Sequence, residues 1–253
     1  MLSKKIIIPI PTYGFDPSEV AIPWKLFSES NIDVVFATPK GKKASADKIM
    51  LNGKGLGIWK PLLMARKDAV KAYFEMEQSE AFCQPLKYKD IKEVNFDAIF
   101  LPGGHDKGVK EYIESEVLQH LAVDFFKANK PVGAICHGVV LLARSINHKT
   151  KKSVLHNYKT TALLKSQELL AYNLTKINLK KYYLTYPGFT VEDEVKSVLS
   201  DSKNFIKGSI PLLRDKQNNL KRGFIVKDKN YLSARWPGDV YRFSNEFIKM
   251  INS

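Results

Sequence analysis

The sequence predicts an α/β fold: a doubly wound, mostly parallel sheet with helices on both faces. Four short apolar runs rich in β-branched residues have the composition of buried strands: residues 6–10, 33–37, 98–102 and 132–135. Segments with helical patterns lie between them, for example at 18–28 and 111–128. Strands that alternate with helices along a chain are typical of a parallel sheet covered on both sides.

The remaining segments extend this pattern in order. Residues 41–95 form an insertion, in which 62–82 has helical composition and 91–96 leads into the strand at 98–102. A further helical stretch is expected at 161–181, a late strand at 230–235 and a closing helix at 239–251. No linker or repeat divides the chain of 253 residues, so we expect one domain, 1–253, with insertions around 41–95 and 160–190.

Composition narrows the possible functions. The net charge is +14, but the lysines are scattered and no zinc-finger spacing or RNA-binding signature accompanies them, so no nucleic-acid partner is expected. No apolar run reaches the roughly 18 residues that span a membrane, and Pro9 and Pro11 interrupt the apolar start. Two cysteines are too few for a disulfide framework. We therefore expect a cytoplasmic protein with no membrane partner.

The most informative segment is Val-Gly-Ala-Ile-Cys-His-Gly at 132–138. A short strand, a nucleophile-type residue, a glycine and a second apolar run predict a nucleophile elbow, which lifts one side chain above the sheet edge. That residue is Cys136, with His137 beside it. The start of the following helix is expected to favour the thiolate, so Cys136 is predicted to be reactive. Cys83, by contrast, is expected to be a packed thiol.

Sites in parallel sheets form beyond the carboxyl ends of the strands. Three segments with suitable residues follow predicted strands, at 11–19, 103–107 and 136–138. We therefore expect these three segments to meet at one edge of the sheet. The aromatic residues at 182, 183 and 186 and Trp236 are expected mainly in the core, with the cleft or an oligomer contact as alternatives.

The elbow, together with Leu-Pro-Gly-Gly-His at 101–105 and Glu-Val-Ala-Ile-Pro at 19–23, resembles the ThiJ/PfpI superfamily, which is related to class I glutamine amidotransferases. The resemblance covers most of the chain. The insertions make it similar to the larger branch, which includes heat-shock chaperones and glutathione-independent glyoxalases. It implies a single class I glutamine amidotransferase-like domain with a flavodoxin-like sheet, a homodimer and a role in the stress response.

The resemblance also implies roles for individual residues. Cys136 matches the reactive cysteine, His137 the histidine of a Cys-His-acid triad, and Glu19 a glutamate that meets the cysteine. Gly104 and the backbone N–H of His137 match the oxyanion-hole positions, and Glu168 has the spacing of the third triad acid.

Gly103 and His105 are further candidates for the pocket. The relatives' metal site has no recognisable counterpart among the five histidines, so neither a metal nor a cofactor is expected. Val139 stands where many relatives have proline.

Simpler roles exist for three of these side chains. Glu19 also suits the first turn of a helix, with Asp16 or Ser18 as the cap. His137 can turn away from the sulfur and cap its helix, and Glu168 can belong to a solvated helix face.

Two classes of function follow from the sequence. The first is a cofactor-independent enzyme that acts on a small carbonyl substrate, such as an α-oxoaldehyde, by thiol addition at Cys136 and proton transfer by His137 or Glu19. Deglycation shares the first step, and an amidase or peptidase is the hydrolytic variant. The second class is non-enzymatic: a holdase chaperone, or an oxidant sensor that reads the oxidation of Cys136.

Overall fold

The computed structural model describes residues 3–253 and has a seven-stranded sheet at its centre. Its strands, in spatial order, are β10 (Ile225–Asp228), β11 (Tyr231–Ala234), β7 (Val132–Ile135), β6 (Ala98–Leu101), β1 (Lys5–Pro9), β3 (Asp33–Thr38) and β5 (Leu86–Lys87). All neighbours are parallel except β10 and β11. The predicted α/β class with a mostly parallel sheet is confirmed.

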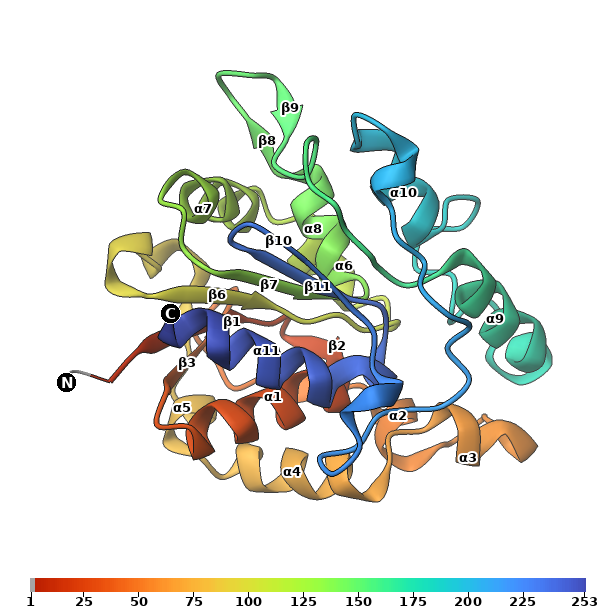
Figure 1. Ribbon diagram of the computed structural model, residues 1–253. Helices are drawn as coiled ribbons and strands as arrows, with labels where there is room; N and C mark the ends of the chain where they lie inside the picture. The colour runs from red at the N-terminus through yellow and green to blue at the C-terminus, as the bar shows by residue number, and fades with distance from the viewer. Residues whose placement is uncertain (1–2) are drawn as a thin grey trace.

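Helices cover both faces of this sheet (Figure 1). One face carries α1 (Pro17–Glu29) and α11 (Val240–Asn252), with α4 (Lys67–Glu77) packed outside α1. The other face carries α6 (Val109–Ile113), α7 (Glu116–Lys127) and α8 (Gly138–Arg144). This doubly wound arrangement places the carboxyl ends of β1, β6 and β7 side by side at one edge.

An aromatic cluster fills the core between the central strands and α11. Phe100 of β6 packs against Phe243 and Phe247 of α11, with ring centroids 5.2 and 6.5 Å away. Gly133 of β7 makes room for them, because a Cβ there would lie 2.8 Å from the Phe243 ring and 3.0 Å from the Phe247 ring. Rings packed this closely contribute beyond their buried area, and they hold β6 and β7 in fixed register.

The prediction of one helix over 111–128 is wrong. The structure has two, α6 and α7, because Ser115 adopts an extended backbone conformation and its hydroxyl accepts from the N–H of Leu118. A serine at this position caps a new helix and so interrupts the old one.

The insertion at 41–95 is also more divided than its composition predicts. Residues 62–82 hold α4 with the ends of two short helices, α3 (Lys60–Leu63) and α5 (Glu80–Cys83). Arg66 is extended before α4, and Ser79 caps α5 through the N–H of Phe82. The same region adds α2 (Lys48–Asn52) and a small parallel pair, β2 (Tyr13–Phe15) with β4 (Ser45–Ala46).

The second insertion begins after a hairpin of β8 (Ile146–Asn147) and β9 (Lys152–Ser153). It contains α9 (Lys165–Leu179), so the expected helix over 161–181 starts four residues late. The next helix, α10 (Val191–Val198), is tied to the end of α8 by a bidentate ion pair between Arg144 and Glu194. Figure 1 shows α9 and α10 together beyond the end of β11. This insertion therefore lies next to the sheet edge at which the predicted site segments end.

Two late elements agree with expectation: the strand at 230–235 is β11, and the closing helix at 239–251 is α11. The antiparallel edge strand β10 was not predicted. Among residues 3–253, we find no helix with both the length and the apolar character needed to cross a membrane.

Candidate active site

The turn between β7 and α8 has the geometry of a nucleophile elbow. Cys136 has a φ of 56°, which is unusual for a residue with a side chain. Gly138 opens α8 against β6, where a Cβ would lie only 2.1 Å from the carbonyl oxygen of Leu101. The turn is therefore pressed against the neighbouring strand, and it presents the cysteine at the carboxyl end of β7.

The Cys136 sulfur lies between a histidine and a glutamate. It is 3.4 Å from Nδ1 of His137, and the nearby Glu19 carboxyl raises the pKa of the thiol. The Glu19 Oε2 atom also accepts from the backbone N–H of Gly103, at 2.9 Å. One carboxyl thus joins the nucleophile to the loop that follows β6.

The start of α1 holds Glu19 in this position. Asp16 caps the helix by accepting from the N–H groups of Ser18 and Glu19, at 2.7 and 3.1 Å. Its own N–H donates to the carbonyl of Gly103 at 3.0 Å. The predicted meeting of the segments 11–19, 103–107 and 136–138 is therefore confirmed.

The expectation of a low thiol pKa is wrong. Cys136 has no exposed surface, and its burial raises the pKa well above the usual value for a thiol. The nearby acids Glu19 and Asp16 raise it further, which outweighs the hydrogen bond from the backbone N–H of His137. The resting thiol is protonated, so any chemistry at this sulfur requires a base.

Burial also sets the state of the two acids. It raises the pKa of Glu19 well above the usual range, and the charge of Asp16 adds to this effect. The Asp16 pKa is raised by burial as well, opposed by the Arg214 guanidinium. A protonated Glu19 can both donate and accept hydrogen bonds at the thiol.

Two buried histidines adjoin the sulfur. Their rings, those of His105 and His137, pack edge to face with centroids 5.1 Å apart. Burial lowers the pKa of His105 to about 4 and that of His137 well below its usual value. Both imidazoles are neutral near pH 7, so His137 has a lone pair that can accept the thiol proton.

Glu168 is placed in the first turn of α9 and is almost fully buried. Its Oε2 atom accepts from the N–H of Val191 at 3.0 Å, and burial raises its pKa to about 7. The structure does not bring Glu168 into hydrogen-bond contact with His137, whose Nε2 has no protein partner. Its role as the third triad acid stays a prediction.

One of the two backbone groups predicted for the oxyanion hole lies next to the sulfur. The N–H of His137 points to the Cys136 sulfur, and the N–H of Gly103 is taken by Glu19. Gly104 packs too tightly for a side chain, since a Cβ there would lie 2.6 Å from the carbonyl oxygen of Gly14. The roles of Gly104 and His137 toward an oxyanion remain predictions.

A cavity of about 100 Å³ touches the site through His105. Its walls are mainly apolar, and its polar members include Asp16, Gln167, Tyr183, Arg214 and the indole of Trp236. The Tyr183 hydroxyl, the Trp236 Nε1 and Gln167 Oε1 atoms are buried without a protein partner. A water needs roughly 10–15 Å³ of such space, so the cavity has room for a small polar molecule.

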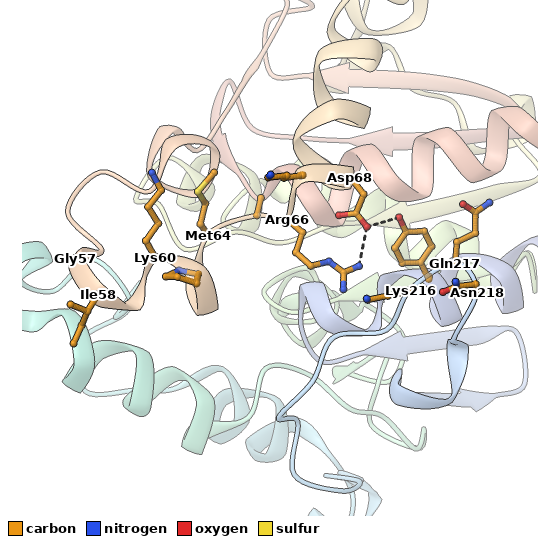
Figure 2. A pocket seen from close by; sticks show the side chains of 13 residues that line it. Gly57, Ile58, Lys60, Met64, Arg66, Asp68, Lys216, Gln217 and Asn218 are labelled. Carbon is orange, nitrogen blue, oxygen red and sulfur yellow. Dashed lines mark hydrogen bonds and ion pairs between the residues drawn. The ribbon is translucent and has the colours of Figure 1, made fainter.

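A larger hollow lies elsewhere. An open groove with a volume of about 1230 Å³ lies between the segments 57–68 and 216–218, and Figure 2 shows the side chains that line it. Its lining is mostly exposed, and its carboxylate, Asp68, is already engaged by Arg66 and the Tyr241 hydroxyl. No residue that contacts Cys136 lines this groove, so its size says nothing about the chemistry of the thiol.

Sequence reasoning missed Arg214, and it expected Tyr183 and Trp236 mainly in the core, with the cleft position that they occupy as an alternative. Lys107 helps to place Tyr183 at the cavity. Its ammonium group donates hydrogen bonds to the carbonyls of Lys181 and Leu184, which connects the segment 181–184 to the loop after β6. The sequence carries no local signal for such a contact. The expectation that Cys83 is packed is wrong, since its side chain is exposed.

Comparisons with known proteins agree with this fold. A family model described as ThiJ/PfpI family-like matches residues 10–199. A solved structure of glyoxalase III from Candida albicans superposes with a TM-score of 0.71 and 19% identity, covering 98% of this chain and 97% of that one. At this identity the likeness establishes the fold.

Two curated relatives carry activity names. A deglycase of Thermococcus kodakarensis is 24% identical over 166 residues, which span 66% of this chain and 69% of that protein. A glutathione-independent glyoxalase of Schizosaccharomyces pombe is 26% identical over 162 residues, 62% of each chain.

Proposed function

The chain belongs to the ThiJ/PfpI-like family, and from this premise we propose that it is a cofactor-independent cysteine enzyme that converts small α-oxoaldehydes into hydroxy acids. The observation that carries the proposal is the contact between the Cys136 sulfur and Nδ1 of His137 at 3.4 Å. A protonated thiol beside a neutral imidazole is a nucleophile with its base in place. The glyoxalase and deglycase names of the relatives support this class of activity.

The first step is addition of the thiol to the aldehyde carbon. His137 takes the thiol proton while the sulfur attacks, and the carbonyl oxygen becomes the hydroxyl of a hemithioacetal when that proton is returned. Backbone N–H groups at His137 and Gly104 would stabilise the oxyanion as it forms. Substrate and enzyme are then joined by one carbon–sulfur bond, and this addition involves no net oxidation or reduction.

The second step moves a proton between the two substrate carbons. A base, His137 or Glu19, removes it from the former aldehyde carbon, and an enediol-like intermediate accepts it at the neighbouring carbon. The product is a 2-hydroxyacyl thioester of Cys136. Water hydrolyses this thioester to a hydroxy acid and the free thiol, so the former aldehyde carbon is oxidised and its neighbour reduced without a redox cofactor.

Glu168 completes the proposed Cys136-His137-Glu168 triad. Its carboxyl has a pKa of about 7 and one hydrogen bond from the Val191 N–H, while Nε2 of His137 has no partner. We propose that the two groups engage when substrate occupies the site. An ionised Glu168 would then stabilise the imidazolium that forms on proton transfer.

The size and lining of the adjoining cavity favour a small substrate. A volume of about 100 Å³ suits a molecule such as methylglyoxal, and the unpartnered Tyr183 hydroxyl and Trp236 indole N–H can donate to its oxygens. Because Cys136 has no exposed surface, the His105 ring or its neighbours must move for the substrate to reach the sulfur.

The test is turnover of methylglyoxal by purified, reduced protein without glutathione, followed as loss of substrate and formation of lactate. We expect Cys136→Ser to abolish turnover and Glu168→Ala to lower kcat by about 100-fold or more, the usual contribution of acid–base assistance. Glu168→Gln separates the two roles of this residue, since it can keep the hydrogen bond to Val191 but cannot ionise.

Cys83→Ser is the matched control, because this exposed thiol lies outside the site. Absence of turnover in folded, reduced wild type would rule out this substrate, and turnover retained by Cys136→Ser would rule out the mechanism.

One observation favours a second candidate, a holdase chaperone. Large apolar side chains are strongly exposed in three segments: Ile58 at 84%, Ile177 at 92%, and Ile210 and Leu212 at 79% and 73%. A holdase needs exposed apolar side chains that form a contiguous patch. Suppression of aggregation that survives Cys136→Ser but is lost in Ile210→Ser/Leu212→Ser would identify this activity.

A further inference from the structure

We propose that Cys136, His137 and His105 form a three-ligand site for a thiophilic divalent cation such as Zn²⁺, and that the bound cation blocks the thiol. The inference that the cation inhibits the enzyme rests on the proposed function, whereas the inference that the cation binds does not.

The three ligand atoms are already close to one another. The Cys136 sulfur and one ring nitrogen from each histidine all lie within 4.8 Å of one another. Zinc binds sulfur at about 2.3 Å and imidazole nitrogen at about 2.0–2.1 Å, so tetrahedral ligand atoms are roughly 3.3–3.6 Å apart. The contact from the sulfur to His137 Nδ1, at 3.4 Å, has this separation, and a rotation of the His105 ring brings in the third ligand.

Both imidazoles have nitrogens to offer. Nδ1 of His105 and Nε2 of His137 are buried and make no hydrogen bond with the protein. The neutral imidazole is the form that binds metals. Unsatisfied nitrogens are rare in a protein interior, and a cation between the rings gives at least one of them a partner.

The surrounding charges act in both directions. Glu19 and Asp16 are buried beside the sulfur, and negative charge on either would stabilise a cation there. Lys107 and Arg144 oppose it through their effect on His137. However, the guanidinium of Arg144 is neutralised by its bidentate pair with Glu194, and the Lys107 side chain is exposed to solvent.

The replacement of the thiol proton of Cys136 by the cation accounts both for metal binding and for inhibition of the thiol. The cation replaces the thiol proton, which passes to solvent, and a sulfur–metal bond forms in place of the sulfur–hydrogen bond. Three protein ligands leave one tetrahedral position for water. While the metal is bound, the sulfur electron pair is not available for attack on a carbonyl carbon.

A second pair of histidines must be controlled. His120 and His148 are both exposed, and their rings lie 5.0 Å apart, close enough to bind a divalent ion at the surface. The measurements therefore use the double variant Cys83→Ser/His148→Ala as background. Neither substitution touches the site around Cys136.

The experiment titrates Zn²⁺ by calorimetry, and Co²⁺ by absorbance, into this reduced, chelator-treated protein without substrate. We expect one equivalent of Co²⁺ to give the charge-transfer absorption of a cobalt thiolate. Cys136→Ser should abolish that absorption, and His105→Phe should weaken Zn²⁺ binding by at least about tenfold. Circular dichroism verifies the fold of each variant, and Cys136→Ser remains informative if His105→Phe does not fold.

Failure to bind in the background protein, or binding unchanged in Cys136→Ser, would overturn the site. Binding seen only when His148 is present would assign the ion to the surface pair and would overturn it equally. Turnover of methylglyoxal is measured separately in excess chelator, so an inactive protein that binds zinc refutes the proposed function and leaves the metal site standing.

Discussion

Glu19 connects the nucleophile to the rest of the site. Its carboxyl accepts from the Gly103 N–H and raises the pKa of the nearby Cys136 thiol, and its helix is capped by Asp16. A buried carboxyl and a buried thiol this close titrate as a coupled pair. Negative charge on the Glu19 carboxyl raises the pKa of the thiol, so this carboxyl helps to keep Cys136 protonated before substrate arrives.

We therefore predict that Glu19→Gln lowers the pKa of Cys136. The amide oxygen still accepts from Gly103, but the carboxyl whose charge and hydrogen bond raise the thiol pKa is gone. The measurement is the rate of alkylation of Cys136 against pH, read by mass spectrometry in a Cys83→Ser background. An unchanged or higher pKa would show that burial alone sets the value.

At the scale of residues, the sequence predicted which side chains form the site better than it predicted their pKa values and contacts. The glycine and apolar pattern around Cys136 encodes the turn locally, which is why the elbow was correctly predicted. The raised thiol pKa depends on Glu19 and Asp16, which reach the sulfur only through the fold. The separation of Glu168 from His137 depends likewise on the position of α10, which Arg144 and Glu194 fix.

Among the elements, the elbow helix depends most on a single residue. Gly138 places α8 directly against β6, where the obstacle to a side chain is the backbone oxygen of Leu101 rather than a flexible group. Neither the strand nor the turn can move independently, because β6 pairs with both β1 and β7. The position of the thiol is thus set by how closely a helix approaches a strand.

Gly138→Ala should consequently destabilise the fold and disable the thiol. Overpacking typically costs about 1–3 kcal/mol, and a Cβ at 2.1 Å from a backbone oxygen belongs at or above the upper end of that range. Urea denaturation measures the loss. Gly57→Ala is the control: its φ is also positive, at 54°, but its nearest neighbour lies 3.7 Å away, so only backbone strain of about 1–2 kcal/mol is expected.

The elements also show where local patterns are insufficient. The strands β1, β3, β6 and β7 were predicted within one residue at each end, because buried parallel strands are continuous apolar runs. Short elements were missed, such as the edge strand β10, whose four residues are two apolar ones followed by Lys227 and Asp228 and so carry no clear strand pattern. The break between α6 and α7 depends on one capping serine within an otherwise uniform helical pattern.

Across the whole molecule, several acids are buried without a full ion pair. Burial raises the pKa of Asp47, Glu168 and Asp215 to about 7 each. Each binds a proton more tightly in the folded than in the unfolded chain, so its contribution to the free energy of unfolding falls as pH rises from about 4 to about 7. The buried histidines act oppositely below about pH 6.5, because the unfolded chain binds their protons more tightly.

Asp47→Asn isolates one of these contributions. The amide oxygen can still accept from the N–H groups of Ile49 and Met50, but it does not titrate. The variant should lose less stability than wild type as pH rises from about 5 to about 7, the window below the folded pKa of Asp47. Urea midpoints measured across this range test the difference, and parallel curves for the two proteins would contradict the assignment.

The hydrogen bond between Glu19 and Gly103 joins residues that are 84 positions apart in the sequence. Cys136 follows both of them in the sequence and is therefore synthesised last. During synthesis the thiol therefore has no partner until both earlier segments have paired across the sheet edge. An unfolded chain exposes this cysteine with an ordinary pKa, whereas the native fold buries it and keeps it protonated. Folding thus converts an exposed thiol into a buried, protonated one. Cys136 is therefore oxidised most readily in chains that have not completed folding or have unfolded.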